Sequence, residues 1–378
     1  MKITALKISK KPKFDYILFL ATILLVAFGV LMVYSASFYS AGLTYGNKFF
    51  FAKKQIIGAI IGLVALIALR FVNYNVFYKL RYIALIVSAA LLALVFIPGL
   101  GVTNYGATRW INLGVTTLQP SEIAKFGYVI FAASMLAKNY EKIKTFKGIL
   151  PCILGGCLIC ILIIIEPNMS ITLCVGFTML IMLLVGGARF KHFAIIGSVA
   201  LVLAVVLVLT EPYRLKRLMA FIDPWASAQG EGFQLVQSLY AIGSGGWFGV
   251  GLFNSRQKYL FLPFSESDFI FSIIAEEWGF VGCLCLCLVF AIVIWRGIKI
   301  AKNAKDRFGC YLASGITAII AVQLIINVAV VSGSIPPTGL PLPFISSGST
   351  SLVVFMGAIG ILQNIHWQSV KAKEDYIK

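Results

Sequence analysis

The chain has 378 residues, of which 60% are hydrophobic and only 12% are charged, and its mean hydropathy is +0.94. A water-soluble domain carries about twice that share of charged residues and could not bury so much apolar surface, so a soluble fold is excluded. The apolar runs are continuous rather than alternating, which excludes a transmembrane β-barrel and predicts an all-α, polytopic membrane protein.

In chain order, the apolar runs predict about ten membrane spans in a single domain over residues 1–378. A large polar segment at about 211–267 separates the seventh span from the eighth. Its aromatic residues and scarcity of charge runs indicate an ordered loop rather than a linker. The spans are expected at residues 14–37, 54–71, 82–98, 119–137, 148–165, 169–188, 192–210, 268–295, 308–333 and 345–366.

The basic residues orient these spans. Of the 32 Lys and Arg, 22 lie in the two termini and in the loops around 70–81, 138–147, 189–191 and 296–307. Because Lys and Arg concentrate in cytoplasmic loops, both termini are predicted to be cytoplasmic and the 211–267 loop to lie outside. This topology accounts for the net charge of +18, so the charge does not indicate a nucleic-acid partner.

The connection before the fourth span, together with the start of that span, is rich in polar side chains. Pro120 suits the first turn of a helix, where its missing N–H costs nothing. Glu122 and Lys125 follow three residues apart on one helix face, just inside the membrane, where ionisable side chains are costly. Two interpretations stay open: a structural ion pair, or a functional pair that acts with the nearby Arg109.

Further cations are predicted at the outer surface. Arg217 and Lys258 lie in the 211–267 loop, and Lys54 opens the second span. An anionic group in the outer leaflet would meet them, although a lysine like Lys54 often only extends its amine to the interface. Gly249 and Gly251 would let the backbone approach a ligand closely, but this glycine pattern is a weak signal by itself.

Asp268 opens the eighth span, and two interpretations of it are open: a helix N-cap or a functional carboxylate. The segment Ile335–Ser351 packs four prolines and a Ser/Gly run between the last two spans. Irregular backbone at membrane depth is tolerated only against protein or a water-filled cavity, so this segment is expected to line the same outward cavity as the long loop. With no His/Cys/Asp cluster at ligand spacing, no metal site is predicted.

Taken together, these segments resemble the SEDS family of bacterial cell-wall proteins (shape, elongation, division and sporulation), which includes FtsW, RodA and SpoVE. The matching motifs follow the family's order over nearly the whole chain, and their amino-acid sequences are nearer those of FtsW and SpoVE than those of RodA. They are GVLMVYSAS, TRWINLG followed by QPSEIAK, GEGFQLVQSLYAIGSGGWFGVGL, SRQKYLFLP, DFIFSIIAEEWGFVG and PPTGLPLPFISSGSTS. The chain departs from the family at Phe264–Ser267, at Asn168, where an Asp is usual, and at Ser349, where a Gly is usual.

The resemblance implies a peptidoglycan glycosyltransferase that polymerises lipid II at the outer face of the bacterial cytoplasmic membrane, for division or sporulation. Asp268 falls on the family's catalytic Asp, and Glu122 and Lys125 fall on its functional Glu and Lys. For holding the substrate, the candidate cations are Lys125, Arg109, Arg217, Lys258 and Lys54.

The implied partners are lipid II, the growing glycan strand, a class B penicillin-binding protein that supplies the transpeptidase, other division proteins and membrane lipid. No cofactor is assigned, although a divalent cation such as Mg²⁺ at the diphosphate is left open. Two other functions are kept as alternatives: a lipid II flippase, and a non-catalytic membrane scaffold for division proteins.

Overall fold

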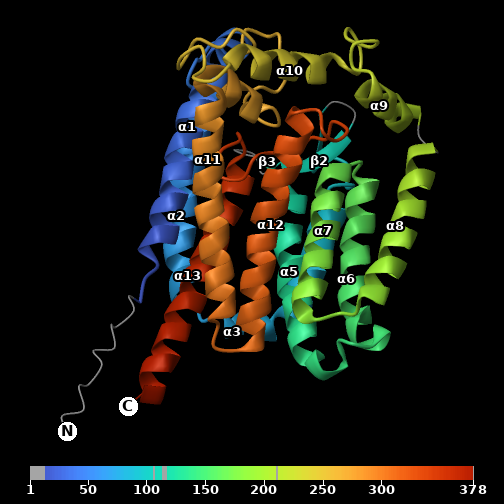
Figure 1. Ribbon diagram of the computed structural model, residues 1–378, viewed down its shortest axis with the longest axis vertical. Coiled ribbons are helices and arrows are strands. Elements are labelled where there is room, and N and C mark those ends of the chain that lie inside the picture. Colours follow the sequence, from blue (N-terminus) through green and yellow to red (C-terminus); the bar gives the residue numbers. More distant parts are fainter. Residues whose placement is uncertain (1–12, 105–106, 113–116, 210–211, 378) are drawn as a thin grey trace, which may run out of the picture.

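The computed structural model describes residues 13–104, 107–112, 117–209 and 212–377. Its long helices run side by side as a bundle (Figure 1). They are α1 (Tyr16–Tyr45), α2 (Phe50–Phe71), α4 (Arg81–Leu94), α5 (Pro120–Lys138), α6 (Phe146–Ile165), α7 (Met169–Gly186), α8 (Phe190–Leu209), α11 (Ile270–Lys302), α12 (Arg307–Val331) and α13 (Ser349–Ile377).

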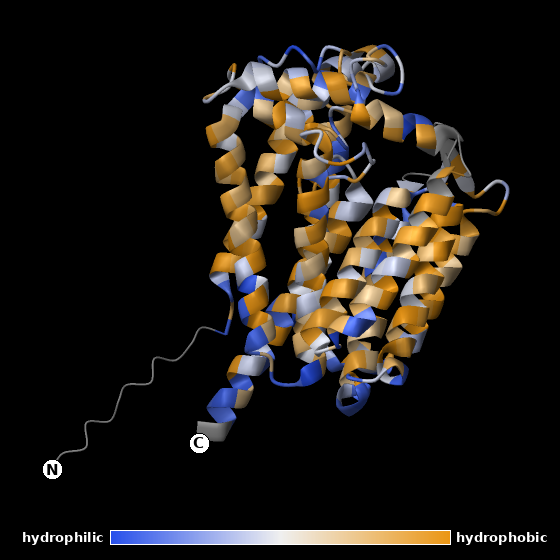
Figure 2. Cartoon of the chain, turned by 45° about the vertical axis from the view of Figure 1, so that its right-hand side comes forward, coloured by the Kyte–Doolittle hydropathy of each residue, from blue (hydrophilic) through white to orange (hydrophobic). Residues whose placement is uncertain are grey.

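Seven helices in the described part of the chain are long and apolar enough to cross a membrane: α1, α2, α6, α7, α11, α12 and α13. Hydrophobic residues cover the bundle along its length, and hydrophilic residues gather in the loops at the end where the C-terminus lies (Figure 2). These features confirm a helical membrane protein. Helices α4, α5 and α8 coincide with three further predicted spans, and the count of ten stays a prediction.

Local capping sets several helix ends. The side chains of Asp15 and Asp306 accept hydrogen bonds from the first turns of α1 and α12, and Gly46 ends α1 in the left-handed region with a φ of 64°. Helices α11 and α13 extend beyond the predicted 268–295 and 345–366. Hydropathy marks only the apolar part of a helix, whereas backbone hydrogen bonding continues into its charged end.

The connection before α5 contains the one element of the described chain that is not helical. There, β1 (Gly101–Asn104), β2 (Ala107–Asn112) and β3 (Thr117–Leu118) form a small antiparallel sheet in the order β1-β2-β3. Gly101 pairs with Ile111, and Ile111 also pairs with Leu118. Backbone groups next to a membrane need hydrogen-bond partners, and this hairpin supplies them between its own strands.

The 211–267 segment contains two helices, α9 (Pro212–Ile222) and α10 (Phe233–Gly245), which lie across one end of the bundle (Figure 1). We call the end of the bundle that these two helices cover the outer end, after the predicted topology. Ser238 of α10 hydrogen bonds to the Ser272 hydroxyl of α11 and to the Val331 carbonyl of α12, both at 2.7 Å. These bonds and the burial of Leu235 hold α10 against the bundle.

Helix α12 organises the site, because it packs against α5, α7, α11 and α13. Of the candidate spans it is the most enclosed, with 72% of its apolar window buried, compared with 22% for α11. Short helices complete the opposite end of the bundle: α3 (Asn75–Lys79) and the 3-10 helix η1 (Tyr140–Lys142).

Candidate functional site

Asp268 lies at the outer end, two residues before α11 begins at Ile270. The N-cap of α11 is Phe269, which makes no side-chain capping bond, so the N-cap interpretation of Asp268 was wrong. Instead, Oδ1 of Asp268 accepts a hydrogen bond from the Ser267 hydroxyl at 3.0 Å, and its backbone carbonyl accepts one from Asn327 of α12 at 2.9 Å. The bond from Asn327 therefore holds the backbone at Asp268 in place, while the Asp268 side chain caps no helix.

The connection from α12 to α13 (residues 332–348, here the proline-rich segment) packs directly against Asp268. The Ser346 hydroxyl donates to the Ser267 carbonyl at 2.7 Å, and the Ser347 N–H donates to the Glu266 carbonyl at 2.9 Å. At Gly339, an added Cβ would stand 2.7 Å from Oδ2 of Asp268. Glycine at 339 therefore leaves room for the carboxylate.

The electrostatic surroundings of Asp268 bring together several of the predicted residues. Burial raises the pKa of this partly buried carboxyl. The Ser267 hydrogen bond and the positive charges of Arg109 and Arg217 lower the pKa, and the negative charge of Glu122 raises it. The net direction is upward, because desolvation outweighs the hydrogen bond and the two positive charges.

Two arginines bind the outer segments together around this carboxylate. Arg109 of β2 donates from Nε to the backbone carbonyl of Glu166 at 3.4 Å and from Nη2 to that of Pro167. Arg217 of α9 donates to the Pro337 carbonyl at 3.5 Å and lies 3.8 Å from a carboxylate oxygen of Glu231. Its side chain is 37% exposed, so it is accessible to an anionic ligand.

Glu122 and Lys125 form a fully buried ion pair in the first turns of α5. The amine of Lys125 lies 3.0 Å from both carboxylate oxygens of Glu122 and 2.6 Å from Oε1 of Gln323. The Ser351 hydroxyl donates to Glu122 at 2.8 Å. This network joins α5, α12 and α13, and the negative charge of Glu122 acts on Asp268. Pro120 occupies the first turn of α5, as predicted.

Lys258 and Lys54 do not join this group. Lys258 is buried, its amine 2.7 Å from Oε1 of Glu277 and 3.3 Å from the Ser35 hydroxyl, so it ties the loop to α11 and α1. Lys54 is exposed on α2, with its amine 4.3 Å from the ring centre of Phe50. Sequence spacing cannot show the partners of Lys258, because Ser35 and Glu277 lie in other segments of the chain.

The buried pair of Lys258 and Glu277 leads to a prediction about the thermal stability of the protein. In Lys258→Met, Glu277 is left buried without its counter-charge, which should cost about 3–5 kcal/mol and lower the thermal unfolding temperature of the purified protein. The double variant Lys258→Met/Glu277→Leu should recover most of this loss. Lost lipid II binding with unchanged unfolding in the single variant would instead return Lys258 to the substrate site.

The loop glycines contact α11. Helix α11 is broken at Gly279, which has a φ of 65°. Val250 N–H donates to the Glu276 carbonyl at 2.9 Å and Gly251 N–H to the Glu277 carbonyl at 3.1 Å. Gly249 has a φ of 81°, and an added Cβ there would collide with the Glu277 carbonyl. The close backbone approach that these glycines permit is therefore to protein, where it satisfies the carbonyls freed by the kink.

Glu166, at the C-terminal end of α6, was not among the predicted site residues. Its side chain is fully buried, and neither carboxylate oxygen has a hydrogen-bond partner. Burial raises the pKa of Glu166 to about 8, although the charge of Arg109 opposes the shift. The only signal in the sequence was a carboxylate beside a proline in a tight turn, where a cap and a cavity-facing group look alike.

Glu166 makes the stability of the protein depend on pH. The unfolded chain ionises this carboxyl at an ordinary pKa and the folded protein only near 8, so stability is lost as pH rises between these values and not further above them. We expect Glu166→Gln to raise the unfolding temperature more at pH 8 than at pH 5. The matched variant Glu141→Gln, at an exposed residue, should change the unfolding temperature equally little at both pH values. Equal changes at pH 5 and pH 8 for Glu166→Gln would contradict the raised pKa of Glu166.

Among the described residues, no three His, Cys, Asp or Glu side chains group as a protein metal site requires. A cation such as Mg²⁺ at a bound diphosphate stays a prediction about the substrate complex.

Known proteins match this chain over almost its full length. The FTSW_RODA_SPOVE family model, described as cell cycle protein, matches residues 15–371. Stage V sporulation protein E of Bacillus subtilis is 42% identical over 94% of this chain and 98% of its own length. The probable peptidoglycan glycosyltransferase FtsW of Trichlorobacter lovleyi is 38% identical over 95% and 96%.

Solved structures have the same fold. A chain from a peptidoglycan synthase complex that coordinates polymerization and crosslinking superposes with a TM-score of 0.78 and 27% identity, covering 94% of this chain and 98% of that one. The rod shape determining protein RodA of Thermus thermophilus has a TM-score of 0.66 and 24% identity, over 93% and 96%, and its likeness concerns the fold alone. With a family model and two relatives matching almost from end to end, the chain belongs to the FtsW/RodA/SpoVE family.

Proposed function

We propose that this chain is a peptidoglycan glycosyltransferase that polymerises lipid II into β-1,4 glycan strands at the outer face of the cytoplasmic membrane. The observation that carries the proposal is Asp268: a carboxylate not used as a helix cap at the outer end, in the field of Arg109 and Arg217. The names of the similar FtsW proteins support this reaction class.

In the proposed reaction, the 4-hydroxyl of the acceptor GlcNAc attacks C1 of the donor MurNAc. Asp268 accepts the hydroxyl proton as the new C–O bond forms and the bond to the lipid diphosphate breaks. The α-linked donor becomes a β-linked product in a single inversion, so no covalent intermediate is required. A positioned carboxylate base contributes about 10²–10⁴-fold to such a step, and the raised pKa of Asp268 makes its ionised form a stronger base.

The departing diphosphate carries the charge that the site must stabilise. Arg109 and Arg217 both act on Asp268 electrostatically, and a guanidinium can donate two parallel hydrogen bonds to phosphate oxygens. We assign the diphosphate to these two residues. Glu122 and Lys125 are assigned the role of a buried support that fixes α5, α12 and α13 around the site.

The proposed setting follows from the basic loops. Both termini are placed in the cytoplasm and α9 and α10 outside, where lipid II is displayed for polymerisation. The proposed partner is a class B penicillin-binding protein that crosslinks the glycan. The match to a chain of a synthase complex that couples polymerization and crosslinking supports such an assembly.

The proposal is tested by reconstituting the purified protein and its transpeptidase partner in liposomes that contain fluorescent lipid II. We expect glycan polymer to form from lipid II exposed on the side of α9 and α10. Transfer of lipid II between leaflets without polymer would favour a flippase. Neither polymer nor transfer, from a complex whose transpeptidase is active, would favour a scaffold.

A further inference from the structure

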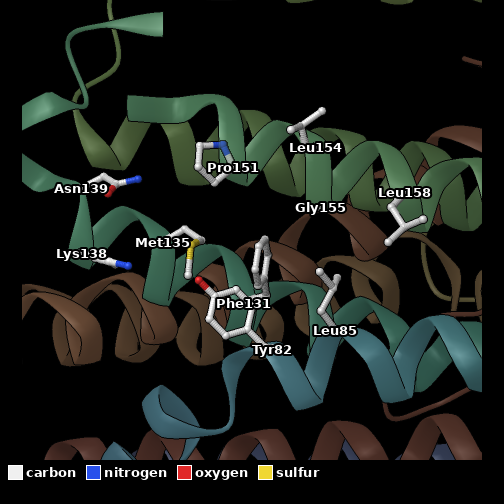
Figure 3. Close-up of a pocket in the computed structure, with 10 residues that line it drawn as sticks. All are labelled: Tyr82, Leu85, Phe131, Met135, Lys138, Asn139, Pro151, Leu154, Gly155 and Leu158. Atoms are coloured by element: carbon white, nitrogen blue, oxygen red, sulfur yellow. The ribbon is translucent and has the colours of Figure 1, made fainter. Parts of the chain in front are cut away.

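A second site lies far from Asp268, in a groove between α4, α5 and α6 (Figure 3). The cavity has a volume of about 410 Å³. Its α5 residues begin at Phe131, nine positions after Glu122 and thus roughly 13 Å further along the helix. The groove is lined by Tyr82, Leu85, Phe131, Met135, Lys138, Asn139, Pro151, Leu154, Gly155 and Leu158.

The walls of the groove are apolar and open to the surroundings. Leu154 and Leu158 of α6 are 59% and 44% exposed, and Tyr82 of α4 is 48% exposed. At Gly155, an added Cβ would collide with the ring of Phe131. The absence of a side chain at Gly155 therefore lets Phe131 pack against α6 and form part of the wall. In a membrane protein, such a slot between helices meets acyl chains.

One end of the groove is polar and basic. Lys138 and Asn139 close it at the C-terminal end of α5 (Figure 3). The guanidinium of Arg81 lies 4.9 Å from the ring centre of Tyr82, and its buried Nε has no hydrogen-bond partner. The following connection adds the exposed side chains of Lys142, Lys144 and Lys147 against the single acid Glu141. The local charge balance therefore favours an anion.

We propose that this groove binds an anionic phospholipid, such as phosphatidylglycerol or cardiolipin, from the leaflet on the side of the basic loops. An acyl chain lies along Phe131, Leu154 and Leu158, and the phosphate contacts Lys138, with Arg81 beside it. Basic pockets between membrane helices at the cytoplasmic face suit anionic headgroups. A zwitterionic lipid would fill the same apolar slot but would gain nothing from the lysine and arginine.

The test is native mass spectrometry of the purified full chain with phosphatidylglycerol, cardiolipin, phosphatidylcholine or a polyprenyl phosphate. We expect the two anionic phospholipids to stay bound at collision energies that release phosphatidylcholine. Lys138→Gln should weaken their binding about fivefold, and Leu154→Trp should fill the slot and reduce binding similarly. The matched controls are Lys302→Gln at the end of α11 and Ile165→Trp, which change an exposed lysine and an exposed apolar residue outside the groove and should bind as the parent does.

Equal retention of phosphatidylcholine, or equal losses in both control variants, would overturn the proposal. So would stronger retention of the polyprenyl phosphate than of either phospholipid, because the groove would then hold a carrier lipid. Thermal unfolding of each variant without added lipid separates lost binding from lost folding: a variant that unfolds as the parent does but no longer retains the anionic lipid supports the site.

Discussion

Asp268→Asn will make no glycan strands from lipid II, although the protein will insert, fold and bind its transpeptidase partner. The substitution keeps the shape of the side chain and leaves an oxygen to accept the 3.0 Å hydrogen bond from Ser267. It removes the carboxylate oxygen that accepts the proton of the attacking hydroxyl in the proposed reaction. Loss of a positioned base typically costs about 10²–10⁴-fold in rate, and gel separation of labelled glycan measures this directly.

The matched control for this variant is Glu266→Gln. Glu266 lies two residues earlier in the same loop, and burial raises its pKa as well, but its backbone carbonyl is held by Ser347 and its carboxylate is not assigned to the reaction. We expect Glu266→Gln to keep polymerisation within a few-fold of the parent. Near-parent polymerisation by Asp268→Asn, or equal loss in both variants, would contradict the assignment of Asp268 as the base.

Lys125→Met will unfold at a much lower temperature than the parent protein. It leaves Glu122 fully buried without the amine that now lies 3.0 Å from both of its oxygens. Removing one partner of a buried ion pair costs about 3–5 kcal/mol, a large part of the stability of most proteins. The double variant Glu122→Leu/Lys125→Met removes both charges, and replacing a buried pair by packed apolar side chains is often neutral. We therefore expect its unfolding temperature to approach that of the parent.

Polymerisation by the same double variant tests whether this buried support is needed for the reaction. The Ser351 hydroxyl of α13 and the Gln323 side chain of α12 both bond to the Glu122–Lys125 pair. Loss of the pair should therefore loosen α12 and α13 near Asp268 and lower the polymerisation rate even where stability is restored. Polymerisation at the parent rate by a stable double variant would remove both residues from the site.

The sequence predicted those features that one segment determines by itself. Continuous apolar runs located the helices, Pro120 located the start of α5, and the carboxylate at the start of the eighth span was identified as Asp268. The small sheet was missed because its strands have two to six residues, too few for a periodic pattern. Helix α10 was missed because its apolar residues are interrupted by Gln and Ser, of which Ser238 bonds to α11 and α12.

Partners that come from distant parts of the chain could not be predicted, unlike the pair of Glu122 and Lys125 three residues apart. Lys258 pairs with Glu277 of α11 and with Ser35 of α1, so a cation that looked suited to a diphosphate has a protein partner. Glu166 shows the opposite case: a carboxylate that looked like an ordinary turn residue is buried without a hydrogen bond. Both outcomes depend on the packing of the helices, which no single stretch of sequence contains.

The most direct test of the central claim is the pH dependence of kcat/KM for lipid II polymerisation by the purified complex. This profile reports the ionisation of essential groups in the free enzyme. Because burial raises the pKa of Asp268 and the base must be ionised, we expect the rate to rise with pH through one ionisation above the ordinary aspartate range, and to do so equally in Glu266→Gln. A profile that is flat across that range, or a rise that disappears in Glu266→Gln, would contradict Asp268 as the general base.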